Sequence, residues 1–301
     1  MSRLFRHLSK IVASAVAVFA TAATPVFTNL ESVAAASVTH SSTLLSPGDY
    51  SESLTWGGLL RTYIVHVPPG ALKIGRPLIL VYHGAGDTAR NTVKETDFEQ
   101  AANQANDIVA FLQGYGDTWN ELTGHTPAAL AHVDDVGFTS AVLNALRPLT
   151  GYNIHRVAAA GLSNGALFVE TLGCRLASRI DLIVPVEGEL ASAISPTCAP
   201  SRPINVFEIH GTSDPIIPYN GGNFSGVGGT VSVLSAPNSV RRWSRLDRCS
   251  AKPQTVHSGD IVSIHYSHCR NSVTVTLRTI IGGIHVWGSN VGQLVTAALG
   301  R

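Results

Sequence analysis

The stretch GLSNGALF, residues 161–168, places a serine between two glycines directly after the apolar run VAAA at 157–160. This Gly-x-Ser-x-Gly spacing is typical of a nucleophilic serine on a sharp turn between a strand and a helix. A chain of 301 residues with 28 glycines also produces the spacing by chance. The surrounding sequence therefore has to decide whether Ser163 is a nucleophile or an ordinary surface serine.

Short apolar runs alternate with amphipathic segments along most of the chain. Runs that are apolar on both faces are typical of strands buried in a parallel sheet, and apolar residues spaced by three and four predict helices. The predicted strands cover 59–68, 77–84, 107–114, 155–163, 181–188, 204–211 and 272–280. The predicted helices lie within 134–151, 164–177, 239–249 and 290–299. This alternation predicts an α/β fold, a mostly parallel central sheet with helices on both faces.

Three of the predicted strands end next to a residue that can carry chemistry. Ser163 follows the strand at 155–163, Asp214 follows the strand at 204–211, and His285 follows the strand at 272–280. In an open α/β sheet, ligands bind outside the carboxyl ends of the strands, so these side chains are expected to meet. The order Ser, Asp, His is that of the α/β-hydrolase fold. We therefore predict a catalytic triad of Ser163, Asp214 and His285.

Each member of this triad has a distinct chemical role. His285 would take the proton of the Ser163 hydroxyl, and Asp214 would hold the other ring nitrogen and stabilise the imidazolium. The oxyanion would be bound by two backbone N–H groups, one from Ala85 in the stretch HGAG at 83–86 and one from Asn164. Triad chemistry of this kind needs neither a cofactor nor a metal, and we predict none.

Other candidate residues have structural interpretations. His83 and His210 each precede a glycine and are expected to be hydrogen-bonded structural histidines. The pair Asp134–Asp135 could suggest acid/base work on sugars, but it stands where a helix begins and is expected to cap it. The glycine-rich stretch 221–229 lacks a nucleotide-binding pattern and is expected to be a flexible loop near the active face.

The N-terminal segment resembles a secretory signal. Three basic residues (Arg3, Arg6 and Lys10) precede an uncharged, largely apolar stretch at 11–27, and small residues suit cleavage after residue 36 or residue 22. A membrane anchor is the alternative, although the apolar stretch is marginal for a span. We therefore expect a signal peptide at 1–36, an N-terminal extension at 37–58 and one catalytic domain at 59–301, secreted to the extracellular space.

Charge and cysteine content limit the partners and the compartment. Residues 1–36 hold three of the 21 basic and one of the 20 acidic residues, which leaves a formal charge of −1 and no basic run for nucleic acid or an anionic membrane. Four cysteines in an exported chain predict two disulfides. Three pairings are possible, and the short loops favour Cys174–Cys198 and Cys249–Cys269. A zinc site is the alternative, but the ligand spacing does not favour it.

Six stretches together carry a resemblance to the secreted poly(3-hydroxybutyrate) depolymerase and feruloyl esterase family, a carbohydrate-esterase group of the α/β-hydrolases. They are LILVYHGAG (78–86), TWN (118–120), VDDVGF (133–138), HRVAAAGLSNGALF (155–168), IHGTSDPIIPYNGG (209–222) and GGIHVWG (282–288). The resemblance implies the same triad and agrees with the favoured cysteine pairing. It places Trp119 near the cleft, and Trp287 is expected there because it lies two positions beyond His285. Both rings are expected to bind substrate, with packing of the loop as the alternative.

The sequence departs from the family pattern at the rim of the expected cleft. Ile284 stands where the family usually has glycine, no proline follows Trp287, and Ala166 occupies a position where glycine is frequent. These differences affect the identity of the substrate more than the type of reaction. We expect a serine esterase acting on short aliphatic esters, hydroxyalkanoate oligomers or polyester, or feruloyl or acetyl esters of plant polysaccharide. A serine peptidase and a noncatalytic binding protein on the same fold are the alternatives, and the oligomeric state stays open.

Overall fold

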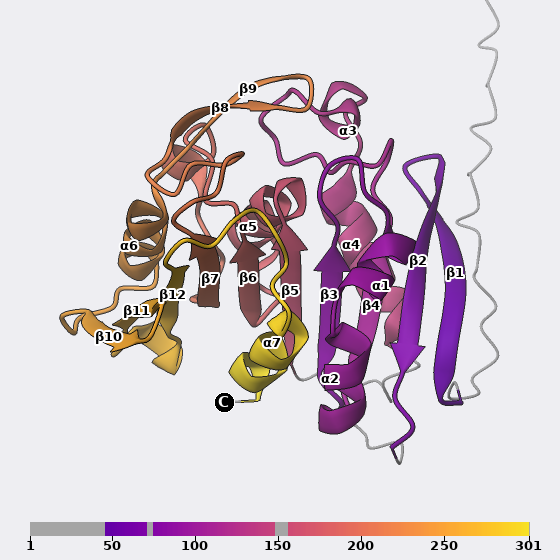
Figure 1. Cartoon of the computed structure of the whole chain (residues 1–301). Coiled ribbons are helices and arrows are strands. Elements are labelled where there is room, and N and C mark those ends of the chain that lie inside the picture. The colour runs from indigo at the N-terminus through magenta and orange to yellow at the C-terminus, as the bar shows by residue number, and fades with distance from the viewer. Residues whose placement is uncertain (1–45, 71–74, 148–155, 301) are drawn as a thin grey trace, which may run out of the picture. The chain divides into compact units, whose positions relative to one another are not determined.

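The computed structural model describes residues 46–70, 75–147 and 156–300. The signal peptide expected at 1–36 lies outside these residues. Ten strands form one sheet (Figure 1). In order across the sheet they are β1 (Gly48–Trp56), β2 (Leu59–Val67), β4 (Ile108–Leu112), β3 (Leu78–Tyr82), β5 (Val157–Leu162), β6 (Leu182–Val186), β7 (Asn205–Gly211), β12 (Val275–Ile280), β11 (Ile261–Tyr266) and β10 (Gln254–Ser258).

The centre of the sheet is parallel and its two edges are antiparallel. Strands β4, β3, β5, β6, β7 and β12 run in one direction, whereas β1 and β2 at one edge and β10 and β11 at the other pair antiparallel. All five residues of β3, β4 and β6 are buried, as expected for strands covered on both faces. The predicted mostly parallel α/β sheet is confirmed.

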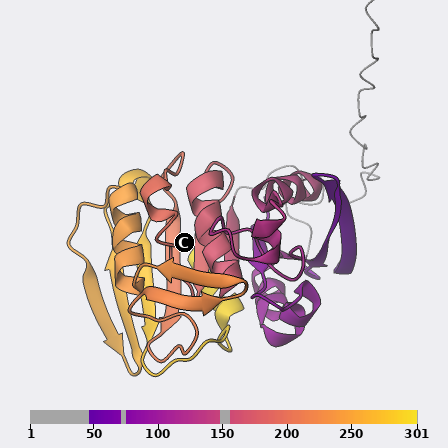
Figure 2. The ribbon, with the colours of Figure 1, turned by 90° about the horizontal axis from the view of Figure 1, so that it is seen from above.

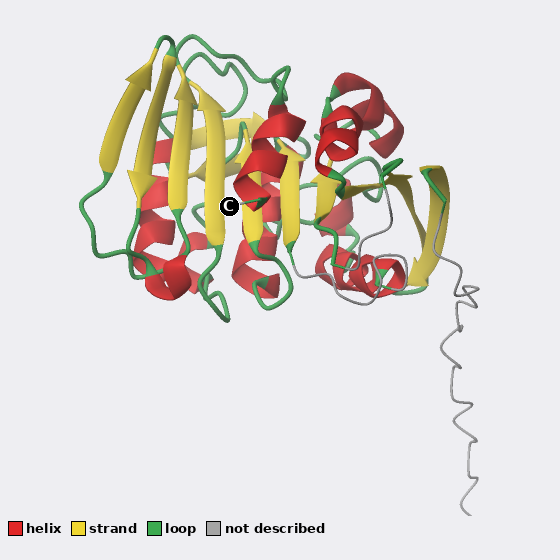
Figure 3. Cartoon of the chain, turned by 90° about the horizontal axis from the view of Figure 1, so that it is seen from below, coloured by secondary structure: helices red, strands yellow, loops and turns green. Residues whose placement is uncertain are grey.

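Helices cover both faces of the sheet (Figure 3). On one face α1 (Ala89–Glu95), α2 (Phe98–Ala105) and α7 (Val291–Leu299) enclose a core around Ile79, Val81 and Phe111. On the other face α4 (Asp135–Leu146), α5 (Asn164–Leu176) and α6 (Ala236–Leu246) enclose a larger core. The Asp134 side chain accepts a hydrogen bond from the Gly137 N–H and caps α4, in the role that the sequence predicts.

The sheet begins before residue 59, the predicted start of the catalytic domain. Strand β1 pairs with β2 along its whole length, from Gly48 opposite Val67 to Trp56 opposite Leu59. The part of the expected extension from residue 48 onward is therefore integral to the sheet. Its strand has one buried residue among nine, so it gives no apolar run from which a strand could be predicted.

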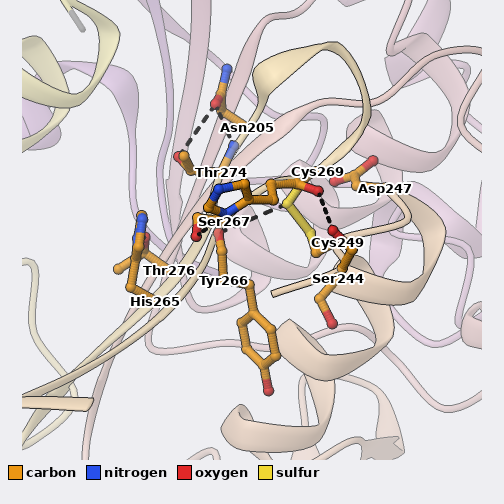
Figure 4. The surroundings of a disulfide bond; sticks show 12 residues. Asn205, Ser244, Asp247, Cys249, His265, Tyr266, Ser267, Cys269, Thr274 and Thr276 are labelled. Atoms are coloured by element: carbon orange, nitrogen blue, oxygen red, sulfur yellow. Dashed lines mark hydrogen bonds between the residues drawn. A yellow bond between two sulfur atoms is a disulfide. The ribbon is translucent and has the colours of Figure 1, made fainter. Parts of the chain in front are cut away.

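Two disulfides join the cysteines in the pairing that the short loops favour. One links Cys174 in α5 to Cys198, and the other links Cys249 to Cys269 beyond the end of α6 (Figure 4). All four cysteines of the sequence are thereby used, which removes the zinc alternative. None of the helices in the described ranges has the length and apolar content that a membrane span needs.

Candidate active site

Ser163 occupies a strained turn between β5 and α5. Its backbone has φ 58° and ψ −120°, a conformation that a side-chain-bearing residue rarely adopts. The two flanking glycines make the turn possible, since a Cβ at Gly161 would collide with the backbone of Gly165, and a Cβ at Gly165 would collide with the carbonyl of Tyr82. The Gly-x-Ser-x-Gly spacing therefore has a steric origin in close strand–helix packing.

Asp214 and His285 meet from separate loops at the carboxyl end of the sheet. The Nδ1 atom of His285 lies 2.7 Å from Asp214 Oδ2. The second carboxylate oxygen accepts the backbone N–H groups of Ile216 and Ile217, at 2.7 and 3.0 Å. Burial alone would raise the pKa of Asp214, but hydrogen bonds from His210 and His285 hold it well below its usual range. Asp214 is therefore an oriented anion directed at His285.

Ser163 and His285 line one pocket, and the two residues expected to bind the oxyanion line it with them. Ala85 and Asn164 both border this pocket. Asn164 is the first residue of α5, where backbone N–H groups have no partner within the helix. The Asn164 side chain is directed away from this role, because its Oδ1 accepts the backbone N–H of Trp119 at 2.7 Å.

The pocket has a volume of about 300 Å³ and a mostly apolar wall. Its apolar lining includes Leu162, Leu167, Ile217, Phe224, Val227 and Val231. Three of these residues come from a hairpin of β8 (Gly222–Gly226) and β9 (Gly229–Val233), the stretch expected to be a flexible loop. The hairpin lies over α5 when the protein is viewed from above (Figure 2), and Phe224 and Val231 pack with Leu167 of that helix. The flexible-loop prediction is wrong, because the stretch forms a hairpin whose glycines lie at the ends of its strands and in its turn.

Trp119 and Trp287 do not line this pocket. Trp119 is fully buried, stacks on Phe168 and donates its indole N–H to the carbonyl of His83 at 3.0 Å. Trp287 is 5% exposed and packs edge-on against Phe98 on the opposite face of the sheet. The expectation that both rings contact substrate is corrected by this geometry. A tryptophan near a catalytic loop in sequence can serve as packing beneath the loop.

The two histidines expected to be structural are both buried, in different surroundings. The His83 ring lies 2.7 Å from the Gly84 carbonyl and accepts the Gly114 N–H at 2.9 Å, and burial lowers its pKa. His210 instead faces three carboxyl groups, from Glu187, Glu189 and Asp214. The sequence analysis did not single out these glutamates, although acidic residues at 187 and 189 directly after a buried apolar strand are an unusual pattern.

Among the residues that the structure describes, two groups of side chains lie close enough together to hold a cation. Asp49, His66 and Glu99 form one, and Glu187, Asp214 and His285 form the other. Hydrogen bonds account for both arrangements, since His66 bonds Asp49 and His285 bonds Asp214. We assign neither group as a metal centre.

Comparison with known proteins gives relatives among esterases. The chain is 30% identical over 236 residues to feruloyl esterase B of Piromyces equi, covering 76% of this chain and 43% of the relative. It is 28% identical over 248 residues to the putative esterase NocK of Nocardia uniformis subsp. tsuyamanensis, covering 76% of this chain and 71% of the relative. The chain thus spans less than half the length of the fungal relative. No protein-family model matches the sequence.

Among solved structures, the acetyl xylan esterase from Aspergillus awamori superposes with a TM-score of 0.58 at 12% identity, covering 80% of this chain and 94% of that one. At this identity the likeness concerns the fold. The sheet order, the strained serine turn and the likeness to this structure show that the chain has an α/β-hydrolase fold, and the sequence similarities are to esterases.

Proposed function

We propose that this protein is a serine esterase that hydrolyses carboxylic esters through Ser163, His285 and Asp214. The observation that carries the proposal is the hydrogen bond of 2.7 Å between His285 and Asp214, at the wall of the pocket that Ser163 also lines. The similarity to a feruloyl esterase and to a putative esterase supports ester hydrolysis. Nucleophilic acyl transfer of this kind requires a serine, a histidine that takes its proton, and an acid that orients the histidine.

In the proposed reaction, Nε2 of His285 takes the hydroxyl proton of Ser163 while Oγ attacks the ester carbonyl carbon. The carbonyl π electrons move to oxygen, and the resulting oxyanion accepts hydrogen bonds from the N–H groups of Ala85 and Asn164. The imidazolium, stabilised by Asp214, then protonates the leaving alcohol as its bond to carbon breaks. Water, deprotonated by His285, attacks the acyl-enzyme in the same way and releases the carboxylic acid and Ser163.

The lining of the pocket supports an apolar acyl group. Leu167, Phe224 and Val231 are buried around a volume that accommodates a ring or a short branched chain. A feruloyl group and a hydroxyalkanoate unit both fit this description, and the fungal relative is a feruloyl esterase. An acetyl group, as in the bifunctional acetylxylan esterase/xylanase of Neocallimastix patriciarum, would leave most of the lining without contact.

We further propose that the protein is secreted. Two disulfides are expected in an oxidising compartment, and the sequence of residues 1–36 resembles a cleaved signal. Protein recovered from culture medium should begin near Ser37, or near Ala23 if the earlier site is used. An intact mass that includes residue 1 would contradict this proposal.

The test of the function is a comparison of Ser163→Ala with Ser225→Ala, a second serine that borders the same pocket. The first variant should lose at least about a thousandfold in kcat on p-nitrophenyl butyrate and should not react with a fluorophosphonate. The second variant should keep its labelling. Retention of a tenth of the activity by Ser163→Ala would refute the triad. Turnover of an amide at the rate of the matched ester would favour a peptidase instead.

A further inference from the structure

His210 lies directly behind the triad acid, at the end of β7, and it is inaccessible to solvent. The carboxylate of Asp214 therefore stands between two imidazole rings. Its Oδ2 atom is 2.7 Å from His285 Nδ1 and 3.3 Å from His210 Nε2. The two ring nitrogens are consequently at most about 6 Å apart, a separation at which the charge of one ring acts on the other.

Both nitrogens of the His210 ring face oxygen atoms. Nδ1 lies 2.7 Å from Glu189 Oε1. Nε2 lies 3.1 Å from the carbonyl oxygen of Ile217 and 3.3 Å from Glu187 Oε2. A carbonyl oxygen only accepts, so Nε2 carries a proton. The charge of a carboxylate 2.7 Å from Nδ1 favours a second proton on the ring. The arrangement fits an imidazolium.

The charged and titratable groups around His210 come from four segments of the chain. Glu187 and Glu189 follow β6, Asp214 follows β7, and Glu208 and Glu170 reach the cluster from β7 and α5. The Tyr219 ring packs edge-on against His210 with the ring centroids 5.8 Å apart. In the ion pairs of the described residues, two basic side chains contact these acids, and they are His210 and His285.

The protonation states follow from this imbalance of acids over bases. Burial opposes a charge on His210, but hydrogen bonds with Asp214 and Glu189 raise its pKa to about 11. Burial raises the pKa of Glu187 to about 8, so this carboxyl group is neutral at pH 7. Among the carboxyl groups beside His210, Asp214 is thus the one held most strongly as an anion.

We propose that His210, held as an imidazolium between Glu189 and Asp214, is a positioning residue that keeps the Asp214 carboxylate ionised and fixed toward His285. The inference rests on the proposed triad and adds a second, buried histidine to its support. His210 touches no reacting atom and acts through Asp214. Because this positive charge lies within about 6 Å of the His285 ring nitrogen, we expect the pH profile of the reaction to depend on it.

The test is the substitution His210→Gln, whose amide can keep a hydrogen bond to Asp214 but carries no charge. We expect kcat to fall by about tenfold, since a charge-assisted hydrogen bond is exchanged for a neutral one, with KM changed less than about twofold. We also expect the acidic limb of the kcat/KM profile to move up by about one pH unit, because a cation within about 6 Å of the triad is lost.

The matched control is His66→Gln. His66 is also a buried histidine paired with a carboxylate, 2.6 Å from Asp49, but it lies on β2 away from the triad. This control should lose stability with its acidic limb unchanged. If the acidic limb of His210→Gln coincides with that of the wild type, His210 is only a packing residue and the inference is overturned.

A measurement on the wild-type protein decides the matter if His210→Gln does not fold. Ring ¹⁵N NMR should show one buried histidine that keeps protons on both nitrogens at pH values where an isolated histidine is neutral. A neutral His210 ring would overturn the inference. These spectra also separate it from the proposed function, because they require no catalysis. A wild type without esterase activity would refute the function, whereas an unshifted profile in an active enzyme would refute only the role of His210.

Discussion

Replacing Trp119 with alanine is expected to destabilise the whole protein instead of changing its substrate preference. The indole is fully buried and stacks on Phe168 with the ring centroids 5.3 Å apart and the planes at 12°. The Tyr82 ring also packs against it in a T-shaped arrangement, with the centroids 5.0 Å apart. The indole N–H donates to the carbonyl of His83 at 3.0 Å. Alanine would leave an unfilled space and an unpaired carbonyl in the larger core.

The magnitude follows from these contacts. Truncation of a buried tryptophan to alanine costs about 3–5 kcal/mol, and loss of the partner for a buried carbonyl adds roughly 1 kcal/mol. In a domain of this size, 1 kcal/mol lowers Tm by about 2–4 °C. Trp119→Ala should therefore lower Tm by roughly 8–24 °C.

The assay combines thermal unfolding with a substrate panel of methyl ferulate, a hydroxybutyrate trimer and p-nitrophenyl acetate. At a temperature where Trp119→Ala remains folded, kcat/KM should fall by the same factor for all three esters, because the ring touches none of them. Trp119→Phe, which keeps a stacked ring but loses the N–H donor, should recover most of the Tm. An unchanged Tm with a selective loss on methyl ferulate would show that Trp119 contacts the acyl group and that its burial has been misjudged.

Further predictions concern the acyl pocket, pH and the disulfides. Phe224→Ala should lower kcat/KM for methyl ferulate by about tenfold more than for p-nitrophenyl acetate, and equal losses would contradict an acyl-binding role. Burial raises the pKa of Glu187 to about 8 and that of Asp247 to about 7, so their stabilising effect is complete below about pH 4 and is lost as the pH rises through 7–8. The Tm should therefore fall between pH 5 and about pH 9, and a rising Tm would refute these protonation states. Reducing Cys249–Cys269, which closes a loop with a sequence separation of 20, should cost about 3 kcal/mol in denaturant titrations.

The parallel centre of the sheet and the position of the reactive residues follow from local patterns in the sequence. Strands β3, β4 and β6 are apolar at every position, so each is visible without knowledge of its neighbours. Ser163, Asp214 and His285 each stand just after such a strand, and parallel strands bring their carboxyl ends to one edge. These predictions require that the strands belong to one parallel sheet, and they do not require the exact strand order.

The antiparallel edges could not be predicted in the same way. Strand β10 is exposed at all five positions and β11 is half-buried at all six, so neither strand is part of the buried parallel centre on which the prediction of strands relied. Strand β11 is held by pairing with β12, and β10 is held by pairing with β11. The hairpin of β8 and β9 is hidden for a similar reason, because its glycines also suit a loop.

The surroundings of Asp214 show a further limit of motif-based prediction. The motif places one acid, one base and one nucleophile, and it is silent about what holds the acid in place. In the folded protein Asp214 Oδ1 is fixed by two backbone N–H groups, while Oδ2 is shared between His285 and His210. A histidine before a glycine is so common that the sequence favours a hydrogen-bonded structural role for His210. Glu187 and Glu189 follow a different strand, and their proximity to His210 is visible only in the folded protein. That proximity is the reason to assign His210 a positive charge beside Asp214.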